Sequence, residues 1–153
     1  MRVAFASDHA AVSLKAVLMA RAVDLGHEVV DLGPYDTTSV DYPDYGFALA
    51  QAMSDGRAER GVALCGSGIG IAIAANRHSA CRCAQVAEPL SARLAREHND
   101  ANAIAMGARL IGEAQAIACL EAFLSTDFLG GRHAARVDKL SLSPSNFPVE
   151  TIA

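Results

Sequence analysis

The hydrophobic and polar positions of this chain follow two alternating patterns over most of its length. Short apolar runs, typical of buried strands, predict strands at residues 2–7, 28–32, 61–65, 81–87 and 103–106. Apolar residues three or four positions apart predict helices at 12–25, 44–54, 89–98, 112–125 and 132–140, with another helix starting beside Gly70. Strands that alternate with helices form parallel sheets covered on both faces. We therefore expect an α/β fold, a Rossmann-like, doubly wound three-layer sandwich with a five-stranded parallel sheet.

The helix predicted at 12–25 has two distinct sides. The side expected to face the core carries Leu14, Val17, Leu18, Arg21 and Leu25, and the opposite side carries Ser13, Lys15 and Asp24. Gly26 is expected to cap the end of this helix. In the helix at 112–125, the positions expected to face inward are Ile117, Leu120 and Leu124.

Residues 33–43 predict a loop, because Gly, Pro, Asp and Thr dominate the segment. The loop also contains Tyr35 and Tyr42, and strand-to-helix loops of such folds often carry function. No linker or repeat interrupts residues 1–140, so we expect a single domain there. Residues 141–153 have two prolines and no regular pattern, and we expect them to form a C-terminal tail.

Composition narrows the functional classes. The chain has 153 residues, of which 52% are hydrophobic and 20% charged, enough to form a packed core. A net charge of -4 and the absence of a basic run argue against nucleic acid as a partner. The densest basic group, Arg132, Arg136 and Lys139, is sufficient for one phosphate. No apolar segment is long enough to cross a bilayer, and the N-terminus does not resemble a signal peptide.

The four cysteines, Cys65, Cys81, Cys83 and Cys119, lack both the spacing of a zinc site and the density of a secreted disulfide framework. We expect four reduced thiols, and therefore a cytoplasmic protein with no metal site.

The segment from Gly61 to Asn76 is the most informative of the sequence. An apolar strand ends at Cys65, three alternating glycines follow, and an Ala/Ile-rich helix begins. Glycines expose backbone N–H groups, which with a helix N-terminus would favour negative charge and a reactive thiol. The glycine spacing fits neither the dinucleotide fingerprint nor a P-loop. The alternative is a purely structural turn beside an inert buried cysteine.

Other candidates follow predicted strands, where parallel sheets bind ligands at the switch in strand order. Asp8 and His9 come directly after the first strand, although either Asp8 or Ser7 could merely cap a helix. The remaining positions after strands are 33–42, Glu88 and Met106-Gly107.

Two further groups lie at helix positions. His98-Asn99 is expected to end a helix, where Asn99 in the left-handed conformation would be a simple C-cap. Arg132 and Arg136 are four positions apart, a spacing that lets two guanidiniums hold one phosphate. Alone, such arginines are more often a solvated helix face.

Taken together, these segments resemble the type B ribose-5-phosphate isomerases, a family that also contains galactose-6-phosphate isomerase. The resemblance runs in order from Val3 to about Val137, and it is carried by Ser7-Asp8-His9, Asp41-Tyr42-Pro43, Cys65–Gly70, Ala74-Ala75-Asn76, Glu88-Pro89, His98-Asn99-Asp100 and Gly130–His133. It implies an aldose–ketose isomerisation of a small phosphorylated sugar, with no metal or organic cofactor.

The resemblance also implies roles for the matching residues. Cys65 would be the base that moves a proton between C1 and C2, and Ser67 would polarise the substrate. Some branches of the family use a glutamate on the following helix instead, but residues 71–75 of this chain contain no acid. The enediolate oxygens would be held by the loop residues Gly66, Gly68, Ile69 and Gly70.

The other half of the implied site handles the ring and the phosphate. His98 would open the furanose ring, aided by Asp8 and Tyr42, and Asn99 would contact the sugar. The phosphate would be bound by His9, Arg132 and Arg136. In this family the active site lies between subunits, so we expect a homodimer or tetramer with shared active sites.

The predicted function is the interconversion of D-ribose 5-phosphate and D-ribulose 5-phosphate through a cis-enediol, a step of the non-oxidative pentose phosphate pathway. Two alternatives stay open. The first is the same reaction on a tetrulose 4-phosphate, a galactose or allose 6-phosphate, or a uronate. The second is a non-catalytic nucleotide-binding module, against which the thiol at the loop argues.

Overall fold

The computed structural model describes residues 1–140 of the chain. Its sheet has five parallel strands in the order β2-β1-β3-β5-β4. The strands are β1 (Arg2–Ser7), β2 (Glu28–Asp31), β3 (Arg60–Cys65), β4 (Cys83–Gln85) and β5 (Ala103–Gly107). The predicted α/β fold with a five-stranded parallel sheet is therefore confirmed. The tail expected after Leu140 lies outside the described residues.

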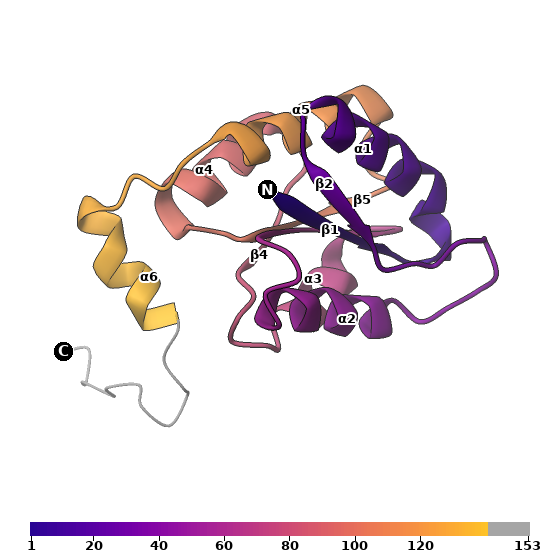
Figure 1. Ribbon diagram of the computed structural model, residues 1–153, viewed down its shortest axis with the longest axis horizontal. Coiled ribbons are helices and arrows are strands. Elements are labelled where there is room, and N and C mark those ends of the chain that lie inside the picture. Colours follow the sequence, from indigo (N-terminus) through magenta and orange to yellow (C-terminus); the bar gives the residue numbers. More distant parts are fainter. Residues whose placement is uncertain (141–153) are drawn as a thin grey trace.

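Helices cover both faces of the sheet (Figure 1). The α-helices are α1 (Val12–Asp24), α2 (Tyr42–Ser54), α3 (Ile69–Ala75), α4 (Pro89–Asn99), α5 (Glu113–Ser125) and α6 (Ala134–Leu140), with short 3-10 helices η1 (His9–Ala11) and η2 (Gly131–His133). The helices α1, α4 and α5 lie on one face, whereas α2 and α3 lie on the other. No helix among residues 1–140 combines the length and the apolar character needed to span a membrane.

The alternation of side chains along the strands divides the core into two halves. In β1, Val3 and Phe5 pack toward α1 and α5, while Ala4 and Ala6 face α2 and α3. The small residues on the second face let α2 and α3 approach the sheet closely. Cys65 belongs to this second half of the core, at the carboxyl end of β3.

Lys15 was predicted on the outward side of α1, and this prediction is wrong: its side chain is only 3% exposed. Burial is tolerated because the ammonium pairs with Asp31 and donates to the Pro34 carbonyl at 2.9 Å. The ammonium also lies 5.3 Å from the centre of the Tyr35 ring. Lys15 thus ties α1 to the loop that follows β2.

Several boundaries differ from the predictions. The helix α2 begins at Tyr42 rather than Asp44, because Pro43 fits the first turn of a helix. The strand β4 is shorter than predicted and covers only Cys83–Gln85. The last helix divides into η2 and α6. Gly26 has a φ of +82°, as expected for a helix C-cap.

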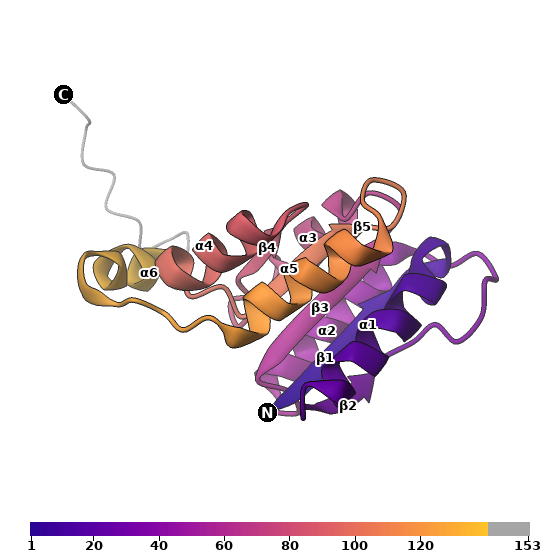
Figure 2. The ribbon, with the colours of Figure 1, turned by 90° about the horizontal axis from the view of Figure 1, so that it is seen from above.

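The helix α4 sets the distance between the two ends of the candidate site. It begins at the carboxyl edge of the sheet, where Glu88 accepts from the backbone N–H groups of Leu90 and Ser91, each at 2.6 Å. It then runs back beside the strands for 11 residues, about 16 Å at 1.5 Å per residue. Its C-terminal end therefore lies near the opposite edge, beside α6 (Figure 2).

Candidate active site

A pocket of about 570 Å³ lies at the carboxyl edge of the sheet. The strands β1 and β3 are neighbours there, and the chain leaves them on opposite sides, which makes this the switch point of the strand order. The pocket is lined by Asp8, Tyr42, Cys65, Gly66, Ser67, Ile69, Gly70, Ile73, Arg109 and Leu110. Seven of the predicted site residues are therefore brought together by the fold.

Cys65 lies at the base of this pocket and is 4% exposed. Its Sγ atom accepts a hydrogen bond from the Gly68 N–H at 3.0 Å. Among the described residues, no acceptor takes the N–H groups of Gly66, Ser67 or Gly70. The sulfur is thus held beside backbone donors that are free to bind an oxyanion. Since α3 has only seven residues, these N–H groups matter more than a helix dipole.

Two positions of the loop require glycine. Gly68 has a φ of +76°, and a Cβ atom there would lie 2.7 Å from the carbonyl carbon of Met106. At Gly70, a Cβ atom would lie 2.5 Å from the Tyr42 ring. The loop is therefore packed against the end of β5 on one side and against Tyr42 on the other. This packing fixes the directions of its N–H groups.

Polar side chains surround the loop. Asp8 is 8% exposed, and its Oδ1 accepts from the Ala10 N–H at 2.9 Å. The alternative prediction that Asp8 caps a helix is therefore confirmed, although the side chain also reaches the pocket. The Ser67 Oγ accepts from the Ile69 N–H at 3.3 Å. Tyr42, at the first turn of α2, covers the loop from outside.

His9 does not line this pocket. Its Nδ1 lies 3.2 Å from the backbone nitrogen of Val40 and accepts that N–H. The contact joins η1 to the loop after β2. His9 is therefore close to the candidate site in sequence, but its ring is engaged with the loop.

Arg109 is a pocket residue that the sequence analysis missed. It follows β5, and its guanidinium lies against the backbone of Gly66. Among residues 1–140, the side chain has neither a hydrogen bond nor an ion pair. Its position in the sequence could have indicated it, because Met106-Gly107 follows a predicted strand and Arg109 comes two residues later. Its positive charge suits an anionic ligand in this pocket.

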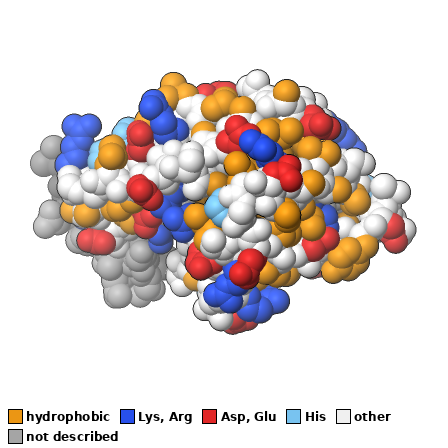
Figure 3. Space-filling view, turned by 45° about the horizontal axis from the view of Figure 1, so that its top comes forward, with side chains coloured by type: hydrophobic (Ala, Val, Ile, Leu, Met, Phe, Trp, Pro, Cys, Tyr) orange, Lys and Arg blue, Asp and Glu red, His pale blue; other side chains and the backbone are white. Residues whose placement is uncertain are grey.

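A second pocket, of about 300 Å³, lies at the α6 end of the molecule. It is lined by His98, Asn99, His133, Arg136, Val137 and Leu140. The rings of His98 and His133 stack with their centres 4.3 Å apart and their planes at 7°. Basic side chains gather at this end of the surface (Figure 3). Three more predicted site residues thus meet, but away from Cys65.

Arg132 and Arg136 do not share one helix, because η2 holds Arg132 and α6 holds Arg136. Both are exposed, and no carboxylate among the described residues pairs with them. His133 between them is buried, and its burial, followed by the charges of His98 and the two arginines, lowers its pKa. The cluster therefore holds unneutralised positive charge for an anion.

Asp100 forms the turn that ends α4, and two arginines hold its side chain. Asp100, not Asn99, takes the left-handed conformation, with a φ of +45°. The buried Arg96 donates to its Oδ1 at 2.8 Å, and Arg82 donates to its Oδ2 at 2.8 Å. This pairing fixes the helix end, so His98 and Asn99 project into the second pocket. The alternative prediction of Asn99 as the left-handed cap is wrong.

All four cysteines are free thiols, as predicted. Within residues 1–140, no three His, Cys, Asp or Glu side chains gather in an arrangement that could hold a metal ion.

Comparisons with known proteins place these two pockets in a family context. The profile of the Ribose/Galactose Isomerase family matches residues 3–140. Ribose-5-phosphate isomerase B of Escherichia coli is 39% identical over 140 residues, which cover 92% of this chain and 94% of that protein. D-erythrulose-4-phosphate isomerase of Pectobacterium atrosepticum is also 39% identical, over 92% of this chain and 93% of its own length.

A solved structure shows the same fold. Ribose-5-phosphate isomerase B of Clostridium thermocellum superposes with a TM-score of 0.90 at 41% identity, covering 92% of this chain and 95% of the other.

Proposed function

This chain belongs to the ribose/galactose isomerase family, and we infer that it is an aldose–ketose isomerase that interconverts D-ribose 5-phosphate and D-ribulose 5-phosphate. The observation that carries this proposal is Cys65 Sγ at 3.0 Å from the Gly68 nitrogen, beside three backbone N–H groups that have no acceptor within residues 1–140. A base next to an oxyanion site is what proton transfer next to a carbonyl requires. The reaction is redox-neutral, so the proposal includes no organic cofactor and no metal.

In the proposed reaction, the Cys65 thiolate removes the proton from C2 of the open-chain aldose. The electron pair moves into the C1–C2 bond, and the aldehyde oxygen becomes an enediolate oxygen bound by the free N–H groups. The Ser67 hydroxyl assists proton movement between O2 and O1. The Cys65 thiol then returns its proton to C1, which gives the ketose and regenerates the thiolate.

The backbone loop suits the enediolate better than the phosphate. Catalysis requires stabilisation of charge that appears only in the transition state. The phosphate is charged throughout, so donors fixed on it would strengthen binding without lowering the barrier. We therefore assign the N–H groups of Gly66, Ser67 and Gly70 to the enediolate. The arginines are assigned to the phosphate, whose charge does not change during the reaction.

The second pocket completes the site in this proposal. His98 opens the furanose ring, Asn99 binds a sugar oxygen, and Arg132 and Arg136 bind the phosphate. About 16 Å of α4 separates its two ends, which is longer than a five-carbon chain with one phosphate. The two pockets also share no lining residue, which supports a site assembled from two subunits. We therefore propose a homodimer in which the second pocket comes from the neighbouring subunit.

One predicted contributor, His9, is engaged outside the Cys65 pocket. His9 was expected at the phosphate, but its Nδ1 is bonded to the Val40 backbone. Only its other ring nitrogen could contact a substrate. Arg109 is the better-placed cation of the Cys65 pocket, and we assign it to the anionic substrate. Asp8 and Tyr42 keep their proposed roles beside the sugar ring.

The substrate could instead have four or six carbons, since one relative is named as a D-erythrulose-4-phosphate isomerase. The distance between the two pockets across the dimer would determine how many carbons the sugar substrate can have. Comparing kcat/KM for four-, five- and six-carbon sugar phosphates separates these cases. The four free cysteines suit the cytoplasm, where thiols stay reduced.

The test is proton NMR of ribose 5-phosphate in D₂O. With the wild-type protein, deuterium should enter at C1 of the ribulose 5-phosphate that forms and, through the reverse reaction, at C2 of ribose 5-phosphate. Cys65→Ala should reduce both processes at least a thousandfold while the protein still binds substrate. Cys119→Ala, which removes a thiol on the other face of the sheet, is the matched control and should keep activity. Undiminished exchange in Cys65→Ala would refute the assigned base.

A further inference from the structure

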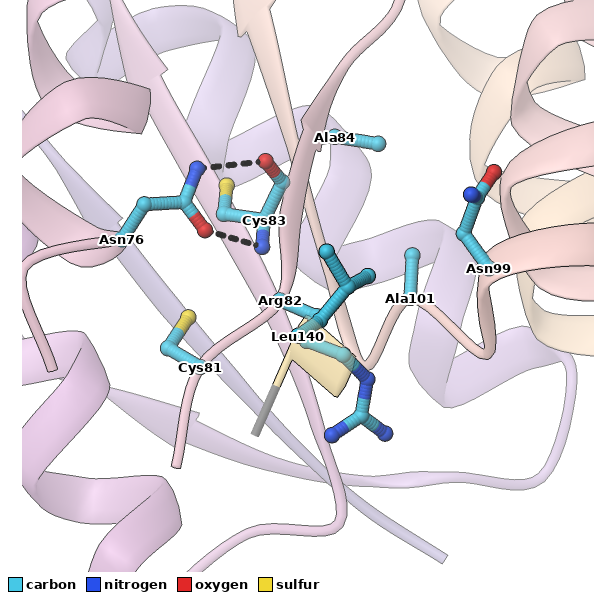
Figure 4. A pocket seen from close by; sticks show the side chains of 8 residues that line it. All are labelled: Asn76, Cys81, Arg82, Cys83, Ala84, Asn99, Ala101 and Leu140. Atoms are coloured by element: carbon cyan, nitrogen blue, oxygen red, sulfur yellow. Dashed lines mark hydrogen bonds between the residues drawn. The ribbon is translucent and has the colours of Figure 1, made fainter. Parts of the chain in front are cut away.

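Cys81 and Cys83, which the proposed mechanism does not use, line a pocket that adjoins the second pocket through Asn99 and Leu140 (Figure 4). Cys81 and Cys83 are 5% and 8% exposed, and they share a pocket of about 320 Å³ with Asn76 and Arg82. The strand β4 is at the edge of the sheet, and no further strand of the described residues covers this side. Cys81 precedes β4 and lies outside the regular strand.

The two thiols lie on the same side of the chain. Residues two apart in an extended segment point to one face, and Figure 4 shows both sulfurs on the side of Asn76. The Asn76 side chain accepts the Cys83 N–H and donates to the Cys83 carbonyl, both at 2.7 Å. Two backbone contacts to Asn76 therefore hold Cys83, whereas the Cys81 N–H donates to the His78 carbonyl at 3.0 Å.

The environments of Cys81 and Cys83 shift the pKa values of the two thiols in opposite directions. The neighbouring Cys83 thiol, followed by the nearby charge of Arg82, lowers the pKa of Cys81. The same interaction, together with burial, raises the pKa of Cys83. Cys119 is a useful contrast, because burial raises its pKa to about 11. A thiolate is the form of cysteine that reacts with oxidants.

We propose that Cys81 and Cys83 form a peroxide-sensitive dithiol site that closes to an intramolecular disulfide. The Cys81 thiolate attacks one oxygen of hydrogen peroxide, which breaks the O–O bond and leaves a sulfenic acid and, after protonation, water. The Cys83 sulfur then attacks the Cys81 sulfur, releases a second water and forms the S–S bond. The two thiols lose two electrons, and the peroxide accepts them.

The geometry makes this disulfide readily reversible. Two residues apart in an extended chain lie up to about 7 Å apart at Cα, whereas disulfides need about 4.4–6.8 Å. Closure therefore requires the chain at Cys81 and Arg82 to tighten. A disulfide formed under such constraint is more easily reduced than a relaxed one.

The sequence offers a direct readout. Arg82 lies between the cysteines, so trypsin separates them into peptides 78–82 and 83–93, while Cys65 and Cys119 fall in 61–77 and 110–132. The full chain is treated with hydrogen peroxide, unfolded in guanidinium so that iodoacetamide can block all remaining thiols, and digested without reductant. We expect peptides 78–82 and 83–93 to be joined, and dithiothreitol to separate them. Cys119 should stay fully alkylated.

Single variants test the order of attack. Cys83→Ser should stop the reaction at a Cys81 sulfenic acid, which dimedone traps, whereas Cys81→Ser should leave Cys83 alkylatable. Full alkylation of both peptides in the wild type, or a link to any other peptide, would overturn the proposal. So would a Cys83→Ser protein without a dimedone adduct. The readout is mass rather than isomerase activity, because Cys65 is itself a thiol.

Discussion

The two pockets of this chain present different kinds of chemical group, backbone N–H groups in one and long side chains in the other. At the carboxyl edge of the sheet, Cys65 and the N–H groups of residues 66–70 are fixed by backbone geometry, and Cys65 is almost fully buried. At the α6 end, Arg132 and Arg136 are exposed side chains on two short helical segments. The first pocket places its groups through packed backbone, and the second through long side chains.

This difference corresponds to two kinds of charge. Charge that develops during a reaction is stabilised best by donors already in position, which need no reorganisation. A phosphate carries its charge before and after the reaction, so flexible guanidiniums can collect it from solution. We therefore expect damage at the carboxyl edge to lower kcat and loss of the arginines at the α6 end to raise KM.

The largest expected effect comes from displacing the loop. Gly68→Ala would put a Cβ atom 2.7 Å from the Met106 carbonyl carbon at a φ of +76°, so the N–H groups should shift. Losing oxyanion donors costs about 3 kcal/mol or more, a drop of two to three orders of magnitude in kcat. Steady-state kinetics measures it. Gly56→Ala, at a φ of +69° with open space around it, is the control and should keep kcat.

His98→Asn should have the next largest effect, but only on a substrate with a closed ring. General acid–base catalysis contributes about a hundredfold or more, so kcat/KM for ribose 5-phosphate should fall by that factor. A tetrose 4-phosphate cannot close a furanose ring, because its O4 carries the phosphate, and should be affected much less. An equal loss for both substrates would mean that His98 does not open the ring.

Removing Arg136 should weaken binding more than chemistry. A hydrogen bond between charged groups contributes about 1.5 kcal/mol or more, so Arg136→Ala should raise KM about tenfold and leave kcat nearly unchanged. Lys139→Ala removes a neighbouring exposed cation that does not line the pocket and serves as the control. A kcat effect larger than the KM effect would contradict the division between the pockets.

The shared-site hypothesis has its own test, which uses two impaired proteins at a ribose 5-phosphate concentration far below the raised KM of the arginine variant. Cys65→Ala and the double variant Arg132→Ala/Arg136→Ala are refolded together. If each site combines both pockets across a two-fold dimer, half of the dimers are mixed and each has one intact site. Activity should then return to about a quarter of the wild-type level. No recovery would mean that both halves of a site come from the same subunit.

The sequence predicted one pocket well because its residues are nearly contiguous. Cys65–Gly70 is a single strand-loop-helix segment, so local patterns were enough to find it. Arg109 was missed because it comes from the end of β5, and only the strand order brings it beside Gly66. Lys15 was misplaced because the partner that permits its burial, Asp31, lies on a different element.

The separation of the pockets was harder to foresee. The candidate residues after strands share one edge of the sheet, but His98 ends a helix that runs back beside the strands. Such a helix carries its last residues to the opposite edge, where Asp100 pairs with Arg82 just before β4. The candidate residues therefore lie at two opposite edges of the sheet, although the sequence grouped them as one site. The direction of each helix relative to the strands, which the alternating pattern predicts, would have placed His98 at the opposite edge.

The smallest expected effect concerns pH and the stability of the α6 end. Burial, His98 and the two arginines lower the pKa of His133 in the folded protein. Below its usual pKa of about 6.5, the unfolded chain binds a proton that the folded one resists, so acidification should destabilise the fold. Above that pH the ring is neutral in both states and the effect vanishes.

His133→Phe isolates this contribution, because phenylalanine can keep the stack on His98 without titrating. Since the chain has no tryptophan, thermal unfolding is followed by circular dichroism at pH 7.5 and 5.5. The wild type should lose more stability over this range than His133→Phe. If the two proteins lose the same amount, the stack is not a source of acid sensitivity. The contrast between the two ends would then concern substrate charge alone.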